Sequence, residues 1–121
     1  MAIQSYKELT VWSEGIVLVE QIYQVCNRFP KHEMYGLASQ MQRAAVSVPS
    51  NIAEGHQRGS TREFLQFIGI ALGSLAELQT QTIIAQKLNY LAAGQADSLG
   101  KHMDKLGKML RSLQRHLKAK L

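Results

Sequence analysis

The sequence predicts an all-α protein, an up-down-up-down bundle of four helices that forms a single domain over residues 1–121. Three observations predict this fold. The composition is rich in Leu, Ala and Gln and holds only two prolines, which favours helices over strands. Apolar residues recur every three or four positions in four successive segments, as in amphipathic helices. Only short turns separate these segments, and short turns place consecutive helices side by side.

The first helix is predicted from about Ser5 or Thr10 to Arg28. Ser5 and Glu8 have the spacing of a capping box, in which two side chains satisfy free backbone N–H groups at a helix start. The helix should end before Pro30, because the residue preceding a proline is disfavoured in the helical conformation. Its apolar residues predict one buried face: Leu9, Trp12, Ile16, Val19, Ile22, Tyr23 and Cys26.

The second helix is predicted to run from about His32 to Gly55. Its apolar positions keep one phase across Pro49, which favours a continuous helix bent at the proline over two unrelated pieces. The positions are Met34, Leu37, Met41, Ala45, Val48 and Ile52.

Pro49 lacks the N–H group that would bind the carbonyl of Ala45, so this helix needs local compensation. Three polar side chains are candidates to satisfy the freed backbone groups: Ser47, Ser50 and Asn51. The alternative is a break in the helix, with Asn51 and Glu54 forming a new capping box.

The third helix should begin at the pair Ser60 and Glu63, a second capping box, and reach about Tyr90. Such a helix is about 45 Å long, which demands an elongated bundle. Its predicted buried positions are Phe64, Ile68, Ala71, Leu75, Leu78, Thr82, Ala85 and Leu88. The fourth helix follows the turn at residues 89–97 and carries an unbroken heptad seam of Leu99, Met103, Leu106, Leu110, Leu113 and Leu117.

The whole net charge of +5 lies in the last 25 residues. Residues 1–96 hold seven basic and seven acidic residues, whereas residues 97–121 hold seven basic residues against two acids. Six cations are predicted to lie along the outer side of the fourth helix and are candidate nucleic-acid-binding residues: Lys101, Lys105, Lys108, Arg111, Arg115 and Lys118. A one-sided basic segment indicates an anionic partner. The alternative is a solvated face that keeps the protein soluble.

Two glycine pairs interrupt the predicted helices, Gly69 with Gly73 and Gly100 with Gly107. Each glycine costs a helix interior about 1 kcal/mol relative to alanine. The pairs therefore predict close approach of another helix, either within the bundle, which we favour, or from another subunit.

The segment VPSNIAEGHQRGS, residues 48–60, matches no catalytic motif. Gly55 and Gly59 lie too close together for a phosphate-binding loop, and no lysine follows them. They are predicted to cap and turn the chain instead, with Glu54 pairing to Arg58 or Arg62. The four histidines and the single cysteine show no metal-site spacing, so we expect no enzymatic activity, metal or cofactor.

The sequence shows no apolar N-terminal signal region and no run of about 18 apolar residues, so no membrane contact is expected. The single cysteine, Cys26, is predicted to be a buried thiol in a cytoplasmic protein.

Two segments carry a family resemblance: RAAVSVPSNIAEG, residues 43–55, and EFLQFIGIALGSLAELQTQ, residues 63–81. Together they resemble the signature of the bacterial four-helix-bundle proteins known from 23S rRNA intervening sequences. YKELTVW at residues 6–12 and FPKHEMYGLASQMQRAA at residues 29–45 also fit, so the resemblance covers about residues 6–91.

The resemblance implies a ring-shaped homopentamer without established enzymatic activity. A more distant relative, the accessory protein of diversity-generating retroelements, is similar in fold and associates with nucleic acid and a reverse transcriptase. The signature positions, with a structural or contact role, are Arg43, Ser47, Pro49, Ser50, Asn51, Glu54, Gly55 and Arg58.

Two functions follow from this pattern. The first is a homo-oligomer that binds nucleic acid, structured RNA in particular, through the basic fourth helix. The second is a protein-interaction scaffold that recruits a polymerase or ribosomal factor, in which the basic face serves solubility or an acidic partner.

Overall fold

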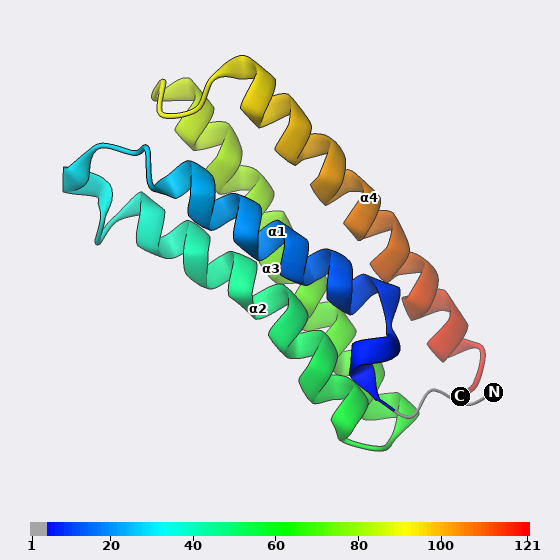
Figure 1. The fold of residues 1–121 in the computed structure, drawn as a ribbon. Helices are drawn as coiled ribbons and strands as arrows, with labels where there is room; N and C mark the ends of the chain where they lie inside the picture. Colours follow the sequence, from blue (N-terminus) through cyan, green and yellow to red (C-terminus); the bar gives the residue numbers. More distant parts are fainter. Residues whose placement is uncertain (1–4) are drawn as a thin grey trace.

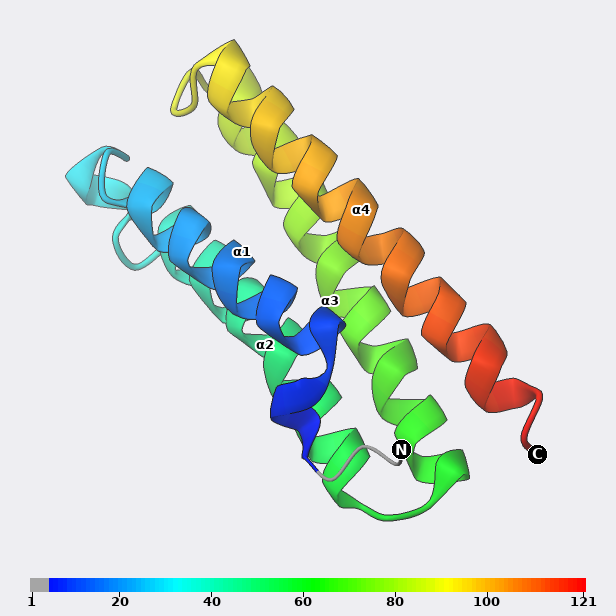
Figure 2. The same cartoon turned by 45° about the vertical axis from the view of Figure 1, so that its right-hand side comes forward.

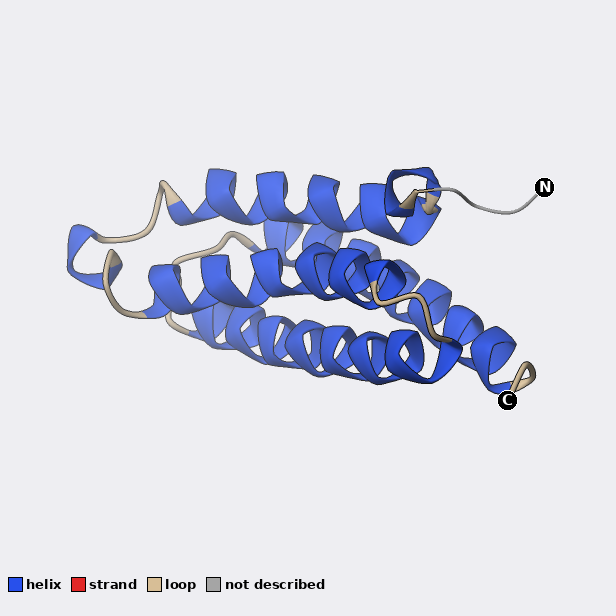
Figure 3. Cartoon of the chain, turned by 90° about the horizontal axis from the view of Figure 1, so that it is seen from below, coloured by secondary structure: helices blue, strands red, loops and turns tan. Residues whose placement is uncertain are grey.

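The computed structural model describes residues 5–121, which fold into four α-helices and no β-strand. The helices are α1 (Thr10–Cys26), α2 (Leu37–Gln57), α3 (Thr61–Lys87) and α4 (Ala93–Lys118). Each helix runs back beside the one before it (Figures 1 and 2). Figure 3 shows that short loops join the helices. The predicted all-α, four-helix fold is confirmed. Residues 1–4 lie outside the described residues, and the expectation that the N-terminus carries no signal peptide falls partly on them.

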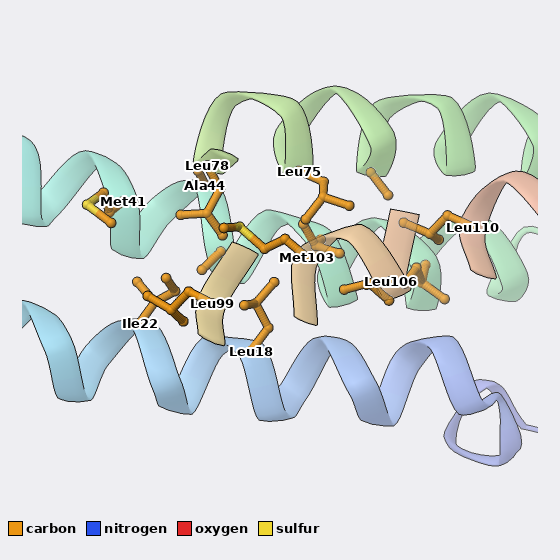
Figure 4. Close-up of a cluster of buried hydrophobic side chains, with 14 of the residues drawn as sticks. Leu18, Ile22, Met41, Ala44, Leu75, Leu78, Leu99, Met103, Leu106 and Leu110 are labelled. Atoms are coloured by element: carbon orange, nitrogen blue, oxygen red, sulfur yellow. The ribbon is translucent and has the colours of Figure 1, made fainter. Parts of the chain in front are cut away.

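All four helices contribute to one hydrophobic core (Figure 4). Its largest fully buried side chains are Leu18, Ile22, Met41, Val48, Ile52, Ile68, Leu75, Leu78, Met103, Leu106 and Leu110. Burying one such side chain contributes about 1.5–3 kcal/mol to stability. The heptad seam predicted for α4 is buried except at Leu113, which is half-buried.

The buried face predicted for α1 is wrong at two positions. Ile16 and Tyr23 are 37% and 43% exposed, and the buried face instead contains Val11 and Leu18 beside Ile22. The error has a physical cause, because α1 is apolar on two faces and periodicity does not tell which of them meets the core.

The helix α2 passes through Pro49 without a break. The alternative of a new helix start at Asn51 is therefore wrong, and the bend at Pro49 stays a prediction. Pro49 is buried, and its Cβ lies only 3.2 Å from where a Cβ on Gly15 would stand. The Asn51 side chain donates to the carbonyl of Ser47 at 2.7 Å rather than to the carbonyl of Ala45.

The glycines at the end of α2 have two separate roles. Gly55 is not a cap, because α2 continues to Gln57. A Cβ on Gly55 would stand 2.5 Å from the Cβ of Phe67 on α3, so the missing side chain permits close packing of α2 on α3. Gly59 has a φ of +83°, as predicted for a turn residue, and the Ser60 hydroxyl then accepts from the Glu63 N–H to cap α3.

The helix α2 begins at Leu37, five residues later than predicted, after a short 3-10 helix at Lys31–Glu33. The Glu33 carboxylate accepts from the Leu37 N–H at 3.1 Å and so serves as a cap from outside the helix. Its second oxygen accepts a hydrogen bond from the Tyr90 hydroxyl at 2.8 Å. These two bonds hold the start of α2 against the chain that follows α3.

The last two helices also differ from prediction at their shared turn. α3 ends at Lys87, and Asn89 adopts a positive φ of 63° that stops the helix. α4 already begins at Ala93, inside the predicted turn, where the Gln95 side chain accepts from the Ala92 N–H.

Three of the four paired glycines face open space. A Cβ on Gly69, Gly73 or Gly100 would meet no atom within 4 Å, so the prediction that they pack inside the bundle is wrong. Gly107 alone faces a core residue, with its Cβ position 3.5 Å from Leu75.

Cys26 is buried, as predicted, and its thiol donates to the carbonyl of Ala38 at 3.8 Å. Burial raises the pKa of the Cys26 thiol to about 11. The thiol is therefore protonated and unreactive near neutral pH.

The contact at Gly55 predicts the cost of a single methyl group. We expect Gly55→Ala to lower the free energy of unfolding by about 1–3 kcal/mol, because the added Cβ overlaps Phe67. Gly100→Ala is the matched control and should raise stability by about 0.5–1 kcal/mol, since its Cβ meets open space. Urea unfolding followed by circular dichroism measures both. A Gly55→Ala protein as stable as wild type would contradict the close packing of α2 on α3.

Candidate nucleic-acid interface

The six basic residues predicted on the fourth helix all lie on α4 and are all exposed: Lys101, Lys105, Lys108, Arg111, Arg115 and Lys118. A helix advances about 100° per residue, so positions seven apart lie nearly above one another. Lys101, Lys108 and Arg115 therefore form a line, and the other three lie beside it. The C-terminal end of a helix carries partial negative charge, which favours cations in its last turns.

Two of the six cations are paired with acids. Lys101 lies 3.3 Å from Asp97 one turn earlier on α4, and Lys105 lies 2.7 Å from Glu14 on α1. The remaining four have no ion pair within residues 5–121: Lys108, Arg111, Arg115 and Lys118. The available positive charge is thus concentrated in the C-terminal half of α4.

A polar cluster joins α1 to α4 beside this basic face. Glu14 accepts hydrogen bonds from Lys105 at 2.7 Å and lies 3.3 Å from Nε2 of His102. The Nδ1 atom of His102 lies 2.7 Å from the Gln21 side-chain oxygen. The hydrogen bond from Lys105 and then that from His102 hold the pKa of Glu14 below its usual value. Sequence patterns did not reveal this cluster, because about 90 residues separate its two halves.

A groove borders the free cations where α1 begins. Its apolar wall contains Val11, Met109 and Leu113, and Lys108 and His116 lie at its edge. A second hollow of about 520 Å³ continues from Leu113 and His116 toward the start of α3. These surfaces leave the Leu113 side chain half-buried rather than fully packed.

The signature positions predicted from the sequence lie mainly at helix contacts. Ser47 bonds to Ser74 on α3 at 2.8 Å and to Asn51 on its own helix. Arg58 pairs with Glu54 at 3.2 Å, which confirms one of the two predicted partners. It also lies 3.7 Å from Glu63 and 5.1 Å above the Phe67 ring. With Pro49 and Gly55 in the contacts described above, six of the eight residues make contacts within the described chain.

The other two signature residues, Arg43 and Ser50, have no such role. Both are exposed on the outer side of α2, and neither makes a side-chain hydrogen bond or ion pair with residues 5–121. The structure does not bring Arg43 and Ser50 to the basic face of α4. The residues predicted from the sequence therefore form two separate groups, the signature residues of α2 and the cations of α4. Over the same described range, no group of three His, Cys, Asp or Glu side chains could hold a metal ion.

A model of the family of 23S rRNA-intervening sequence proteins matches residues 7–112. The chain belongs to this family. The match confirms the resemblance carried by residues 43–55 and 63–81. A comparison with curated proteins finds no match.

A crystal structure of another protein shares the fold. It is a protein of unknown function from the S23 ribosomal protein family of Bacteroides thetaiotaomicron. The likeness has a TM-score of 0.81 at 20% sequence identity and covers 87% of this chain and 95% of that chain. At this identity the likeness establishes the four-helix fold and no shared activity.

The cluster around Glu14 predicts how stability depends on pH. The folded-state pKa of Glu14 is lowered from 4.5, so its ionised form stabilises the fold above that pH and the contribution is lost as pH falls through the lower value. Glu14→Gln should therefore lose about 0.5–1 kcal/mol of stability at pH 7 and show a shallower fall in stability below about pH 4.5. Urea unfolding at several pH values measures both effects. The control is Glu20→Gln, because Glu20 is exposed and has no ion pair in the described chain. If both variants showed the same dependence of stability on pH, the stabilising role of Glu14 would be contradicted.

Proposed function

We propose that this protein is a non-enzymatic homo-oligomer that binds structured RNA or another nucleic acid through α4. One observation carries the proposal: the C-terminal half of α4 presents exposed cations that have no ion pair within residues 5–121. They are Lys108, Arg111, Arg115 and Lys118. Residues 1–96 are electrically neutral, so the basic C-terminal segment dominates the electrostatic field of the protein.

The chemistry of this face suits phosphates rather than bases. Lys and Arg on a helix surface neutralise phosphates and release counterions, which gives affinity with little sequence preference. The helix α4 contains no Phe, Tyr or Trp, so it offers no platform on which unpaired bases could stack. A folded RNA recognised by the shape of its backbone therefore fits better than a single strand. The family description mentions an intervening sequence of 23S rRNA, which makes a 23S rRNA fragment the first nucleic acid to test.

Assembly would strengthen this binding. Several copies of α4 on one particle engage one polyanion at high effective concentration, so weak contacts add to a stable complex. The resemblance implies five copies. Light scattering on the purified protein at micromolar concentration should return a mass larger than that of a dimer, and a monomer mass would contradict an oligomer.

A second function, a scaffold for another protein, is favoured by the groove beside α4. Its apolar wall of Val11, Met109 and Leu113 lies next to the side chains of Lys108 and His116. An amphipathic helix with an acidic edge would fit such a surface. This partner would be recognised by apolar contact, so its affinity would depend less on salt than RNA binding does.

The nucleic-acid proposal is tested by reversing three free cations. We expect Lys108→Glu, Arg115→Glu and Lys118→Glu together to weaken binding to a structured 23S rRNA fragment at least tenfold. The dependence of log affinity on log salt should lose about two to three units of slope, because each lost phosphate contact removes about 0.7–0.9. Fluorescence anisotropy at two salt concentrations measures both quantities.

The matched control reverses three exposed cations away from α4: Arg28 just after α1, Lys31 in the connection to α2, and Lys87 at the end of α3. The ends of α1 and α3 lie opposite the C-terminal end of α4 (Figure 1). Both triple variants change the net charge equally, so a difference between them isolates the position of the charge. Equal binding by the two variants, or no binding by wild type at low salt, would contradict the proposal and favour the scaffold.

A further inference from the structure

The outer face of α3 is unusually apolar for a surface that the single chain leaves uncovered. Glu77 is the only charged residue between residues 64 and 86. By length and composition α3 could cross a membrane, contrary to the expectation of no membrane contact. Only 33% of its most apolar 18 residues is buried inside the bundle. Ile70 and Ile84 on this face are 51% and 43% exposed. A soluble protein seldom leaves such a face in water, so a covering surface is required.

Small residues make this face able to accept another helix closely. Gly69 and Gly73 are exposed, and a Cβ at either position would meet nothing within 4 Å. Glycine weakens a helix interior, and no contact inside the subunit compensates for it here. Ala76 and Thr80, which are also exposed, share this face of α3 with the two glycines, and Ile70 and Ile84 lie along one side of it.

A complementary surface lies on the other pair of helices. The side chains of Trp12, Ile16 and Val19 on α1 and of Val46 and Pro49 on α2 line a shallow apolar groove. Ile16 and Val46 are both more than a third exposed. Arg43 lies on the outer side of α2 next to this groove, and it has no ion pair within residues 5–121.

The spacing of residues on the two surfaces agrees. Arg43, Val46 and Ser50 share one face of α2, at steps of three and four residues. Glu77, Gly73 and Ile70 share one face of α3, at steps of four and three residues in the reverse direction. Antiparallel contact therefore places Arg43 beside Glu77, Val46 over the gap at Gly73, and Ser50 beside Ile70. Glu77 has no cation partner within residues 5–121, so this contact would supply one.

We propose that the outer face of α3 in one copy packs into the α1–α2 groove of the next copy, with Glu77 paired to Arg43 across the contact. The inference rests on the proposed homo-oligomer and names its surfaces. Because two different surfaces meet, the contact is head-to-tail and repeats from copy to copy rather than ending at a two-fold dimer; it gives a ring where the rotation between copies closes. The polar carboxyl group of Glu77 at the centre of the α3 face disfavours a lipid bilayer as the cover.

Gly73→Leu tests whether the small-residue face of α3 is a contact surface. Open space at this position lets the single chain fold with equal or greater thermal stability, whereas the leucine blocks the approach of Val46. We expect light scattering to show the subunit mass for Gly73→Leu. Gly94→Leu is the matched control, because this exposed glycine of α4 also faces open space, and it should keep the oligomer mass.

A charge exchange tests the register. Arg43→Glu and Glu77→Arg should each raise the subunit dissociation constant about tenfold or more, and the double variant should restore much of the loss. Arg28→Glu, at an exposed cation without an ion pair in the described range, should leave the constant unchanged.

The outcomes separate this inference from the proposed function. If wild type is an oligomer and Gly73→Leu and both charge reversals keep its mass, the named contact is wrong while the oligomer stands. If wild type is a monomer, the oligomer and the contact both fail. A monomer that sediments with phosphatidylcholine vesicles would overturn the contact in favour of lipid. RNA binding is measured separately, so its loss in the α4 variants leaves the contact untouched.

Discussion

The close packing of α2 against both of its neighbours is the constraint on which the rest of the fold depends. On one side Pro49 fills the space that Gly15 leaves open, and on the other Phe67 fills the space at Gly55. Any larger residue at either glycine would push a neighbouring helix outward. With α1 and α3 fixed in this way, α4 packs into the remaining side through its leucine seam. The contact of α4 with α1 is less extensive than its contact with α3. The polar cluster at Glu14 strengthens the contact with α1.

Sequence periodicity located all four helices, because each carries one face that must leave water. It was most accurate for α4, where only one face is apolar and the opposite face is charged. It failed for α1, where Ile16 and Tyr23 belong to a second apolar face outside the core. The same failure identified a surface of interest, since an apolar face that the subunit does not bury is available to another molecule.

The space beside a glycine in a helix cannot be predicted from the sequence alone. Gly55 and Gly73 both lie inside helices, yet one fits tightly against Phe67 and the other faces open space. The difference depends on which residue of another helix stands opposite, and no local pattern records it. The candidate site on α4 was likewise only partly predictable. The six cations of α4 were predictable from their spacing, whereas the pairing of Lys105 with Glu14 required the folded chain.

The chain separates its surfaces by charge. The apolar faces lie on the electrically neutral part, on α1, α2 and α3, while the whole excess of positive charge lies in residues 97–121, most of which belong to α4. A ring built through the neutral faces would leave every α4 accessible and bring like charges onto one particle. Their mutual repulsion opposes assembly, and a bound polyanion removes it. By linkage, RNA binding and ring formation would then favour each other, because any ligand that prefers the assembled state stabilises that state. Such coupling needs no conformational change within the bundle.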